Sequence, residues 1–116
     1  MLFYPVDERI KTILNDKLFE LERHFNADFI SFYGPLLNGS ENYFLRIIED
    51  LVKDERKKDV LYFMLTTGGG SAGTAERFVN IVRHHYKEIN FIVPDYAYSA
   101  GTILCMSGDS ILMDYF

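Results

Sequence analysis

One serine and one run of glycines hold the residue types that could do chemistry in this sequence. Ser99 follows a short apolar segment, Asn90 to Val93, and precedes another, Ala100 to Met106. A serine between a strand and a helix can present its hydroxyl beyond the strand end, and the amide of the next residue can face an oxyanion. The same serine could instead cap the helix, because serine is a favoured N-cap residue.

The glycine run, Gly68 to Gly70, also lies between a strand pattern and a helix pattern. Glycine reaches positive φ without steric cost and lets a backbone approach a ligand closely, which leaves amide groups free for an anion. Backbone donors and a serine hydroxyl are the two parts that acyl transfer needs close together. The pair therefore predicts an acyl-transfer site.

Two phosphate-binding motifs compete for the glycine run, and both fit poorly. A Walker loop ends in Gly-Lys-Ser or Gly-Lys-Thr, and no lysine lies between positions 58 and 87. The segment GGGSAG, Gly68 to Gly73, fits the dinucleotide pattern, but no acidic residue ends the following strand at Val93. A strand-to-helix turn without chemistry stays open as an alternative.

The spacing of apolar residues predicts which elements position the two segments. Helical spacing predicts helices over 7–26, over 40–53 with Ser40 as its N-cap, over Thr74 to Glu88, and over 100–106 ahead of Gly108. Short apolar or β-branched runs predict strands over 28–33, 60–66, 90–93 and 110–113. The run over 60–66 is nearly all apolar, which is typical of a strand buried on both faces of a parallel sheet.

The alternation of helices and strands favours an α/β fold with a mainly parallel sheet and right-handed crossovers. Ligands bind beyond the carboxyl ends of the strands in such sheets. The glycine run and Ser99 both follow strands directly, so we expect them at the same edge.

Composition and charge exclude several classes of function. With 116 residues, of which 48% are hydrophobic, the chain is one globular domain at most. A net charge of −5 argues against a nucleic-acid partner, which needs a basic face. No apolar run reaches the roughly 20 residues of a membrane span, and no signal peptide begins the chain, so we expect a cytoplasmic protein. The single cysteine, Cys105, is expected in the core.

Three segments together resemble a known group of enzymes. TGGGS at 67–71, YSAGT at 98–102 and SGD at 107–109 resemble the Clp protease and crotonase fold. Within that fold the sequence is most similar to the serine dehydrogenase proteinase family, which is related to the signal peptide peptidases. The interval of 29 residues between Gly70 and Ser99 agrees with the Clp spacing from oxyanion glycine to nucleophile.

The resemblance implies a hydrolase, a serine endopeptidase that needs no cofactor and no metal. Ser99 would be the nucleophile, and the backbone amides of Gly70 and Ala100 would form the oxyanion hole. An extended peptide would lie along the glycine segment as an added strand, so three further residues would bind substrate: Gly69, Ser71 and Ala72. The partners implied are a peptide or an unfolded protein and further copies in a homo-oligomer, while an ATPase partner is left open.

The resemblance spans about residues 28–116, which would be the N-terminal part of an incomplete Clp-like peptidase domain, after an amphipathic leader helix over 1–27. It departs from the family at Gly68, where Clp peptidases usually have proline, a change that would loosen the turn.

The general base is the larger departure. A serine nucleophile needs a neighbouring His or Lys, and no His, Lys or Arg follows Ser99. His24, His84 and His85 are all expected at the opposite, amino edge of the sheet. We therefore expect the base beyond residue 116 and an inactive chain as it stands. The alternative is a non-catalytic pseudo-peptidase, which binds peptide or serves as an oligomerisation module.

Two other enzyme classes share parts of the pattern. An α/β-hydrolase esterase would need glycine where Ala97 stands, and only one helix and one strand separate the glycine run from Ser99, which is too little for that topology. A crotonase acting on acyl-CoA would share the oxyanion donors but would have no use for a serine at this place.

Overall fold

The computed structural model describes residues 4–113, with side chains from residue 12 onward. Its helices are α1 (Tyr4–Phe25), α2 (Ser40–Val52), α3 (Ala72–His85) and α4 (Ala100–Met106), and its strands are β1 (Asp28–Tyr33), β2 (Val60–Thr66), β3 (Glu88–Val93) and β4 (Ser110–Met113). The predicted α/β class is confirmed.

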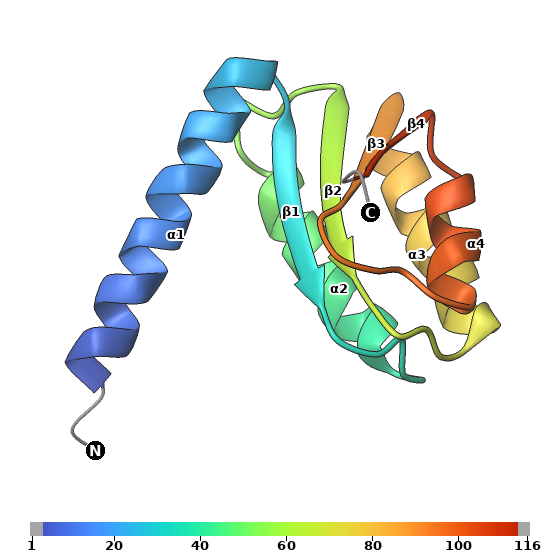
Figure 1. The fold of residues 1–116 in the computed structure, drawn as a ribbon. Coiled ribbons are helices and arrows are strands. Elements are labelled where there is room, and N and C mark those ends of the chain that lie inside the picture. The colour runs from blue at the N-terminus through green and yellow to red at the C-terminus, as the bar shows by residue number, and fades with distance from the viewer. Residues whose placement is uncertain (1–3, 114–116) are drawn as a thin grey trace.

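The four strands form one parallel sheet in the order β1-β2-β3-β4. A helix connects each strand to the next, as parallel neighbours require. Right-handed crossovers that always advance in one direction place α2, α3 and α4 on the same face of the sheet (Figure 1). All strands therefore end at one edge, which we call the carboxyl edge, and begin at the other, the amino edge.

The core lies between the three helices and the sheet face that they cover. Four phenylalanine rings run through it. Phe44 of α2 stacks on Phe78 of α3 at a centroid distance of 4.1 Å, and Phe63 of β2 lies 5.4 Å from Phe44 and 5.3 Å from Phe91. All four side chains are buried, so α2, α3, β2 and β3 pack as one unit.

The opposite face of the sheet is only partly covered, which corrects the prediction that β2 is buried on both faces. Tyr62 and Met64 alternate with the fully buried Leu61, Phe63 and Leu65 and are half-buried. Among residues 4–113, only the last turn of α1 lies over this face. The apolar sequence of β2 thus reflects one helix-covered face and one apolar face without a helix layer.

Helix α1 spans Tyr4–Phe25, so it begins before residue 7, where the helical spacing of apolar residues places its start. Figure 1 shows it leaving the body of the molecule beside β1. Ile13 and Leu14 are more than half exposed, so this end of its apolar stripe is not packed against the rest of the chain. No helix among residues 4–113 has the length and hydropathy needed to cross a membrane.

Two helix starts differ from their predictions because other groups cap them. Gly39, not Ser40, is the N-cap of α2 and has a φ of 97°, while the Ser40 hydroxyl donates to the Leu37 carbonyl at 2.7 Å. Helix α3 begins at Ala72 rather than Thr74, because the Ser71 side chain accepts a hydrogen bond from the Thr74 amide at 3.2 Å.

The end of α3 also differs, because Tyr86 leaves the helix to reach a buried carboxylate. Its backbone turns extended (φ −128°, ψ 140°), so β3 begins at Glu88 instead of Asn90. Its hydroxyl donates to Asp28 of β1 at 2.7 Å, and both residues are buried. Burial first, and the bond to Asp28 second, raise the pKa of Tyr86. This bond ties α3 to β1 at the amino edge.

Candidate active site at the carboxyl edge

The chain beyond β2 pairs with the chain beyond β3. The amide of Thr67 donates to the carbonyl of Tyr96 at 3.1 Å, and the amide of Tyr98 donates to the carbonyl of Thr67 at 3.0 Å. Thr67 and Ala97 therefore form a parallel bridge that extends the sheet past its regular strands. The bridge brings Ser99 beside the glycine run, as the sequence predicts.

The chain beyond β1 pairs with the other side of the glycine run. Leu36 donates to the Gly69 carbonyl and accepts from the Ser71 amide, both at 2.9 Å. These two bonds flank Gly70, and backbone groups of successive residues in an extended chain point to opposite sides. The amide and carbonyl of Gly70 thus point away from Leu36. The Gly70 amide donates no hydrogen bond to another described residue.

Two of the three glycines are required by the local geometry. Gly69 has a φ of 100°, and a Cβ there would lie 2.7 Å from the Tyr98 carbonyl oxygen and 2.8 Å from the Ser99 Cβ. Gly70 has a φ of 145°, and its Cβ would collide with the carbonyl of Leu36. Gly68 has open space around it and no positive φ. The need for glycine is thus confined to the two residues nearest Leu36 and Ser99.

Ser99 adopts a backbone conformation that costs free energy. Its φ of 54° and ψ of −121° lie outside the regions open to most L-residues. Such a conformation costs about 1–3 kcal/mol and persists only when the surroundings enforce it. Here the Thr67 bridge fixes Tyr98 before it, and the Thr102 amide bonds to the Ser99 carbonyl after it at 2.9 Å.

The Ser99 side chain does not cap α4, although the residue occupies the N-cap position. No hydrogen bond joins its hydroxyl to the first turn of the helix, and the residue is exposed. The expectation that the serine hydroxyl caps the helix is therefore wrong. The conformation instead leaves the hydroxyl outside the helix, at the side of the glycine run.

Ala100 is the second residue whose amide the resemblance implies as an oxyanion donor. Its amide donates no hydrogen bond to another described residue. The nitrogen lies 3.4 Å from the point where a Gly69 Cβ would stand, so α4 begins in contact with the glycine run. Two unused amides, of Gly70 and Ala100, thus belong to the segments that meet at Ser99.

The other two predicted substrate-binding residues belong to the start of α3. Ser71 uses its hydroxyl to cap that helix, which leaves its backbone rather than its side chain for a ligand. Ala72 is exposed as the first residue of the helix.

A cluster of three tyrosines at the same edge was not predicted. Tyr96 and Tyr98 stack at a centroid distance of 5.1 Å, and the phenol of Tyr33 raises the pKa of Tyr96. Tyr33 and Tyr98 are 79% and 62% exposed. Each tyrosine ends or follows a strand at the carboxyl edge, which is the signal that could have found them. They give the site an aromatic rim.

The histidines lie at the amino edge, as predicted. His24 is in the last turn of α1, and its ring lies 4.9 Å from that of Phe25. His84 and His85 end α3, about 20 Å along the helix from its start at the carboxyl edge. Burial, His84 and Lys57 lower the pKa of His85. None of the three is placed to take a proton from Ser99.

Metal and thiol chemistry find no support in this part of the chain. Among the described residues, no group of three or more His, Cys, Asp or Glu could hold a metal ion. Cys105 is buried in the core, and burial raises the pKa of its thiol to about 11. It acts as a packing residue, as predicted.

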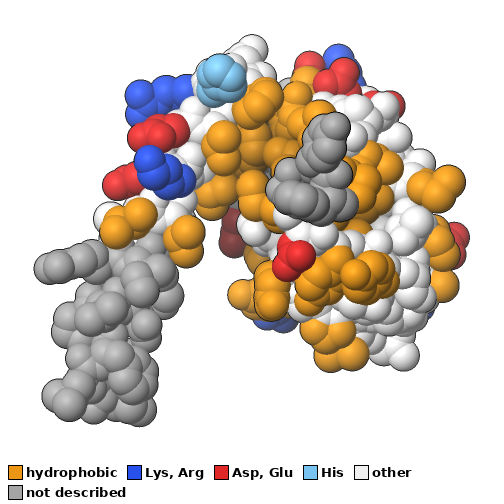
Figure 2. All heavy atoms as spheres, viewed as in Figure 1, with side chains coloured by type: hydrophobic (Ala, Val, Ile, Leu, Met, Phe, Trp, Pro, Cys, Tyr) orange, Lys and Arg blue, Asp and Glu red, His pale blue; other side chains and the backbone are white. Residues whose placement is uncertain are grey.

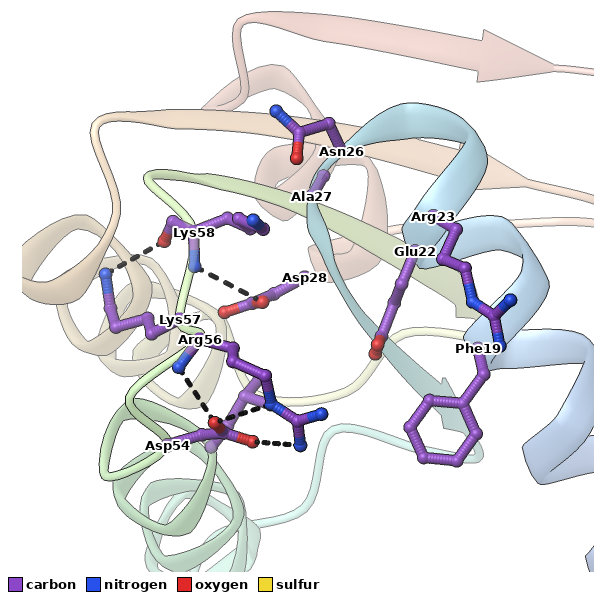
Figure 3. A pocket seen from close by; sticks show the side chains of 11 residues that line it. Phe19, Glu22, Arg23, Asn26, Ala27, Asp28, Asp54, Arg56, Lys57 and Lys58 are labelled. Atoms are coloured by element: carbon purple, nitrogen blue, oxygen red, sulfur yellow. Dashed lines mark hydrogen bonds and ion pairs between the residues drawn. The ribbon is translucent and has the colours of Figure 1, made fainter.

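A cavity of about 460 Å³ lies at the amino edge, away from Ser99 (Figure 3). The end of α1, the start of β1 and the turn before β2 line it. Its charges are mixed and partly paired: Arg56 bonds to Asp54 at 3.2 Å, and Glu22 of α1 and Asp28 of β1 add two more carboxylates. Burial, and then Asp28, raise the pKa of Glu22.

No protein-family model and no curated protein sequence matches this chain. The chemistry of the site must therefore be argued from its own geometry.

A matched pair of glycine substitutions tests the close contact at Ser99. We expect Gly69→Ala to lower the free energy of unfolding by about 1–3 kcal/mol, because it adds a clash and a strained φ. Gly68→Ala should leave it unchanged or raise it by up to about 1 kcal/mol. Urea unfolding measures both. Equal effects of the two substitutions would contradict the contact.

Glycine at position 99 should stabilise the protein. Glycine would relieve about 1–3 kcal/mol of backbone strain at this position. Its greater conformational freedom in the unfolded chain would cost about 0.5–1 kcal/mol, which is less. We expect Ser99→Gly to raise the free energy of unfolding by about 1 kcal/mol, and Ser31→Gly, in the regular strand β1, to lower it. Urea titrations measure the free energy of unfolding of both variants, and the two can be compared if its dependence on urea concentration is the same. A loss of stability in Ser99→Gly would mean that the conformation is not strained.

The raised pKa of Glu22 predicts a pH-dependent stability. A carboxyl whose pKa is higher in the folded state stabilises the fold when protonated, below its unfolded pKa near 4.5, and loses that contribution as the pH rises. Glu22→Gln mimics the protonated form, so its melting temperature should exceed that of the wild type at pH 7. The difference should vanish below about pH 4. A melting temperature of Glu22→Gln below that of the wild type at pH 7 would contradict the raised pKa of Glu22.

Proposed function

We propose that this chain carries the nucleophile and the oxyanion hole of a Clp-like serine peptidase. The observation that carries the proposal is the strained backbone of Ser99 (φ 54°, ψ −121°), whose side chain caps nothing. A conformation that costs free energy and serves no structural bond is typical of functional residues. The hydroxyl emerges at the strand-to-helix turn, where nucleophilic serines of α/β hydrolytic enzymes stand.

In the proposed reaction, the Ser99 oxygen attacks the carbonyl carbon of a peptide bond. The carbonyl oxygen takes the negative charge and accepts hydrogen bonds from the amides of Gly70 and Ala100. A general base takes the serine proton and returns it to the leaving amine as the peptide bond breaks. Water then hydrolyses the acyl-enzyme ester, which restores the hydroxyl.

The substrate would bind as an extended chain beside the glycine run. One side of that run is occupied by Leu36, while the amide and carbonyl of Gly70 face the other side. A peptide strand could hydrogen-bond there with its scissile carbonyl near Ser99. The exposed rings of Tyr33 and Tyr98 stand at the same edge and could contact its side chains.

The general base has to come from outside residues 12–113. The histidines of this part lie at the amino edge, and the raised pKa of Tyr96 keeps that phenol protonated at neutral pH. This observation favours a second candidate, a non-catalytic Clp-like module that binds peptide or assembles with further copies. In both, the glycine run is the peptide-binding strand.

A fluorophosphonate probe, read by intact mass, tests the nucleophile. We expect slow labelling of the wild type that added imidazole accelerates, because imidazole can stand in for the base. Ser99→Ala should abolish labelling, whereas Ser107→Ala, at the far end of α4, should leave it unchanged.

Labelling that survives in Ser99→Ala would refute Ser99 as the nucleophile. An unlabelled wild type, even with imidazole, would favour the non-catalytic module instead. Binding of an unstructured peptide that Gly70→Ala weakens would then support that second candidate.

A further inference from the structure

Two apolar surfaces of this chain are only partly covered by residues 12–113. One is a stripe on α1, formed by Leu14, Leu18, Leu21 and Phe25. The other is the sheet face opposite the helices, which we call the uncovered face. Parallel sheets are normally covered on both faces, because their strands are apolar on both sides. A helix layer is thus missing from one face, and one amphipathic helix lacks a surface to cover.

The stripe on α1 starts at the uncovered face and leaves it. Phe25 lies over that face, with its ring 4.7 Å from Tyr62 and 5.7 Å from Phe29. Toward the amino terminus the helix diverges from the sheet (Figure 1); Leu21 and Leu18 are half-buried, and Leu14 is 57% exposed. The residues of the stripe are four, three and four positions apart in the sequence, so all of them lie on one side of the helix.

The uncovered face carries a row of side chains in register across all four strands. Ser31, Met64, Ile92 and Leu112 are neighbours in that row. Met64 and Ile92 are half-buried, and Leu112 is 45% exposed. Figure 2 shows hydrophobic side chains gathered beside α1 on the face of the molecule turned toward the viewer, which is the uncovered face.

The link between α1 and β1 prevents the helix from covering its own sheet. Only Asn26 and Ala27 join the two elements. Asn26 takes a left-handed φ of 52°, Ala27 is buried, and its amide bonds to the Glu22 carbonyl at 3.2 Å. These contacts fix the direction in which α1 departs. The α1 helix therefore covers its own sheet only with its last turn.

We propose that a second copy of this chain supplies the missing helix layer, by reciprocal exchange of α1 in a twofold dimer. The α1 stripe of each copy lies on the uncovered face of the other. One chain carries both complementary surfaces, which is the condition for an isologous interface. The exchange is independent of any chemistry at Ser99.

The size of the contact suits a stable dimer. Helix α1 has 22 residues, or about 33 Å, and a width of about 10 Å. Two such helices on two sheet faces bury on the order of 1,300 Å² of total surface, within the range of about 1,200–2,000 Å² for stable interfaces. A smaller contact, such as pairing of the four-residue edge strand β4, would bury much less.

Mass measurement by light scattering after gel filtration is the first test. We expect twice the chain mass of 13.5 kDa for the wild type. Leu14→Glu should give the monomer with an unchanged circular dichroism spectrum, because Leu14 is more than half exposed in the single chain. Ile103→Glu is the matched control: Ile103 is 57% exposed, as Leu14 is, but lies on α4, so this variant should stay dimeric.

Cysteine pairing distinguishes helix exchange from other dimers. We expect a mixture of Leu14→Cys and Met64→Cys chains to form a disulfide-linked heterodimer, whereas Leu14→Cys mixed with Ile103→Cys should not. The native Cys105 is buried and does not compete. A monomeric wild type would overturn the proposal. So would a dimer that survives Leu14→Glu or fails to link Leu14→Cys with Met64→Cys, because its interface would lie elsewhere.

Discussion

The pairing of Thr67 with Ala97 is the interaction on which the candidate site depends. It extends β2 and β3 past their last regular residues, so two loops that would otherwise be independent run side by side. Only at that separation does the absence of a side chain at Gly69 matter, because a Cβ there would touch Tyr98 and Ser99. The sheet thus sets the distance, and the glycine permits it. Rigid strand ends hold binding groups more accurately than free loops do.

The two edges of the sheet differ in how their polar groups are bonded. At the amino edge, side chains bond to one another and to the backbone: Tyr86 bonds to buried Asp28, and Asp109 accepts hydrogen bonds from the Ile89 amide and from Arg83. The Ile89 amide, and then Arg83, lower the pKa of Asp109, so the carboxylate persists to acidic pH. Such bonds stabilise the fold, whereas the carboxyl edge leaves backbone amides unused and holds a strained serine. That stability is what allows the strain to persist.

Much of the fold could be predicted from the sequence, because local patterns decided it. The bounds of β1, β2, α4 and β4 follow from apolar runs that stop at glycine, proline or charge. The helix starts were harder to predict. Gly39 is the N-cap of α2 because of its left-handed φ, and Ser71 is the N-cap of α3 because its side chain bonds to the helix; apolar spacing specifies neither feature. The half-covered face of β2 was missed for another reason: an apolar strand sequence says that both faces avoid water, not what covers them.

For the site, the sequence predicts which segments meet but not how they meet. Residue types at strand ends place the glycine run and Ser99 at one edge, yet the tyrosine rim and the backbone angles of Ser99 arise from tertiary pairing. The angles change the interpretation most. A serine before a helix ordinarily caps it with its side chain, and here the Ser99 hydroxyl makes no such bond although the residue occupies the N-cap position. The pairing of Thr67 with Ala97 that aligns the two loops also imposes the backbone angles of Ser99. The conformation of Ser99 and the position of the glycine run therefore have the same structural cause.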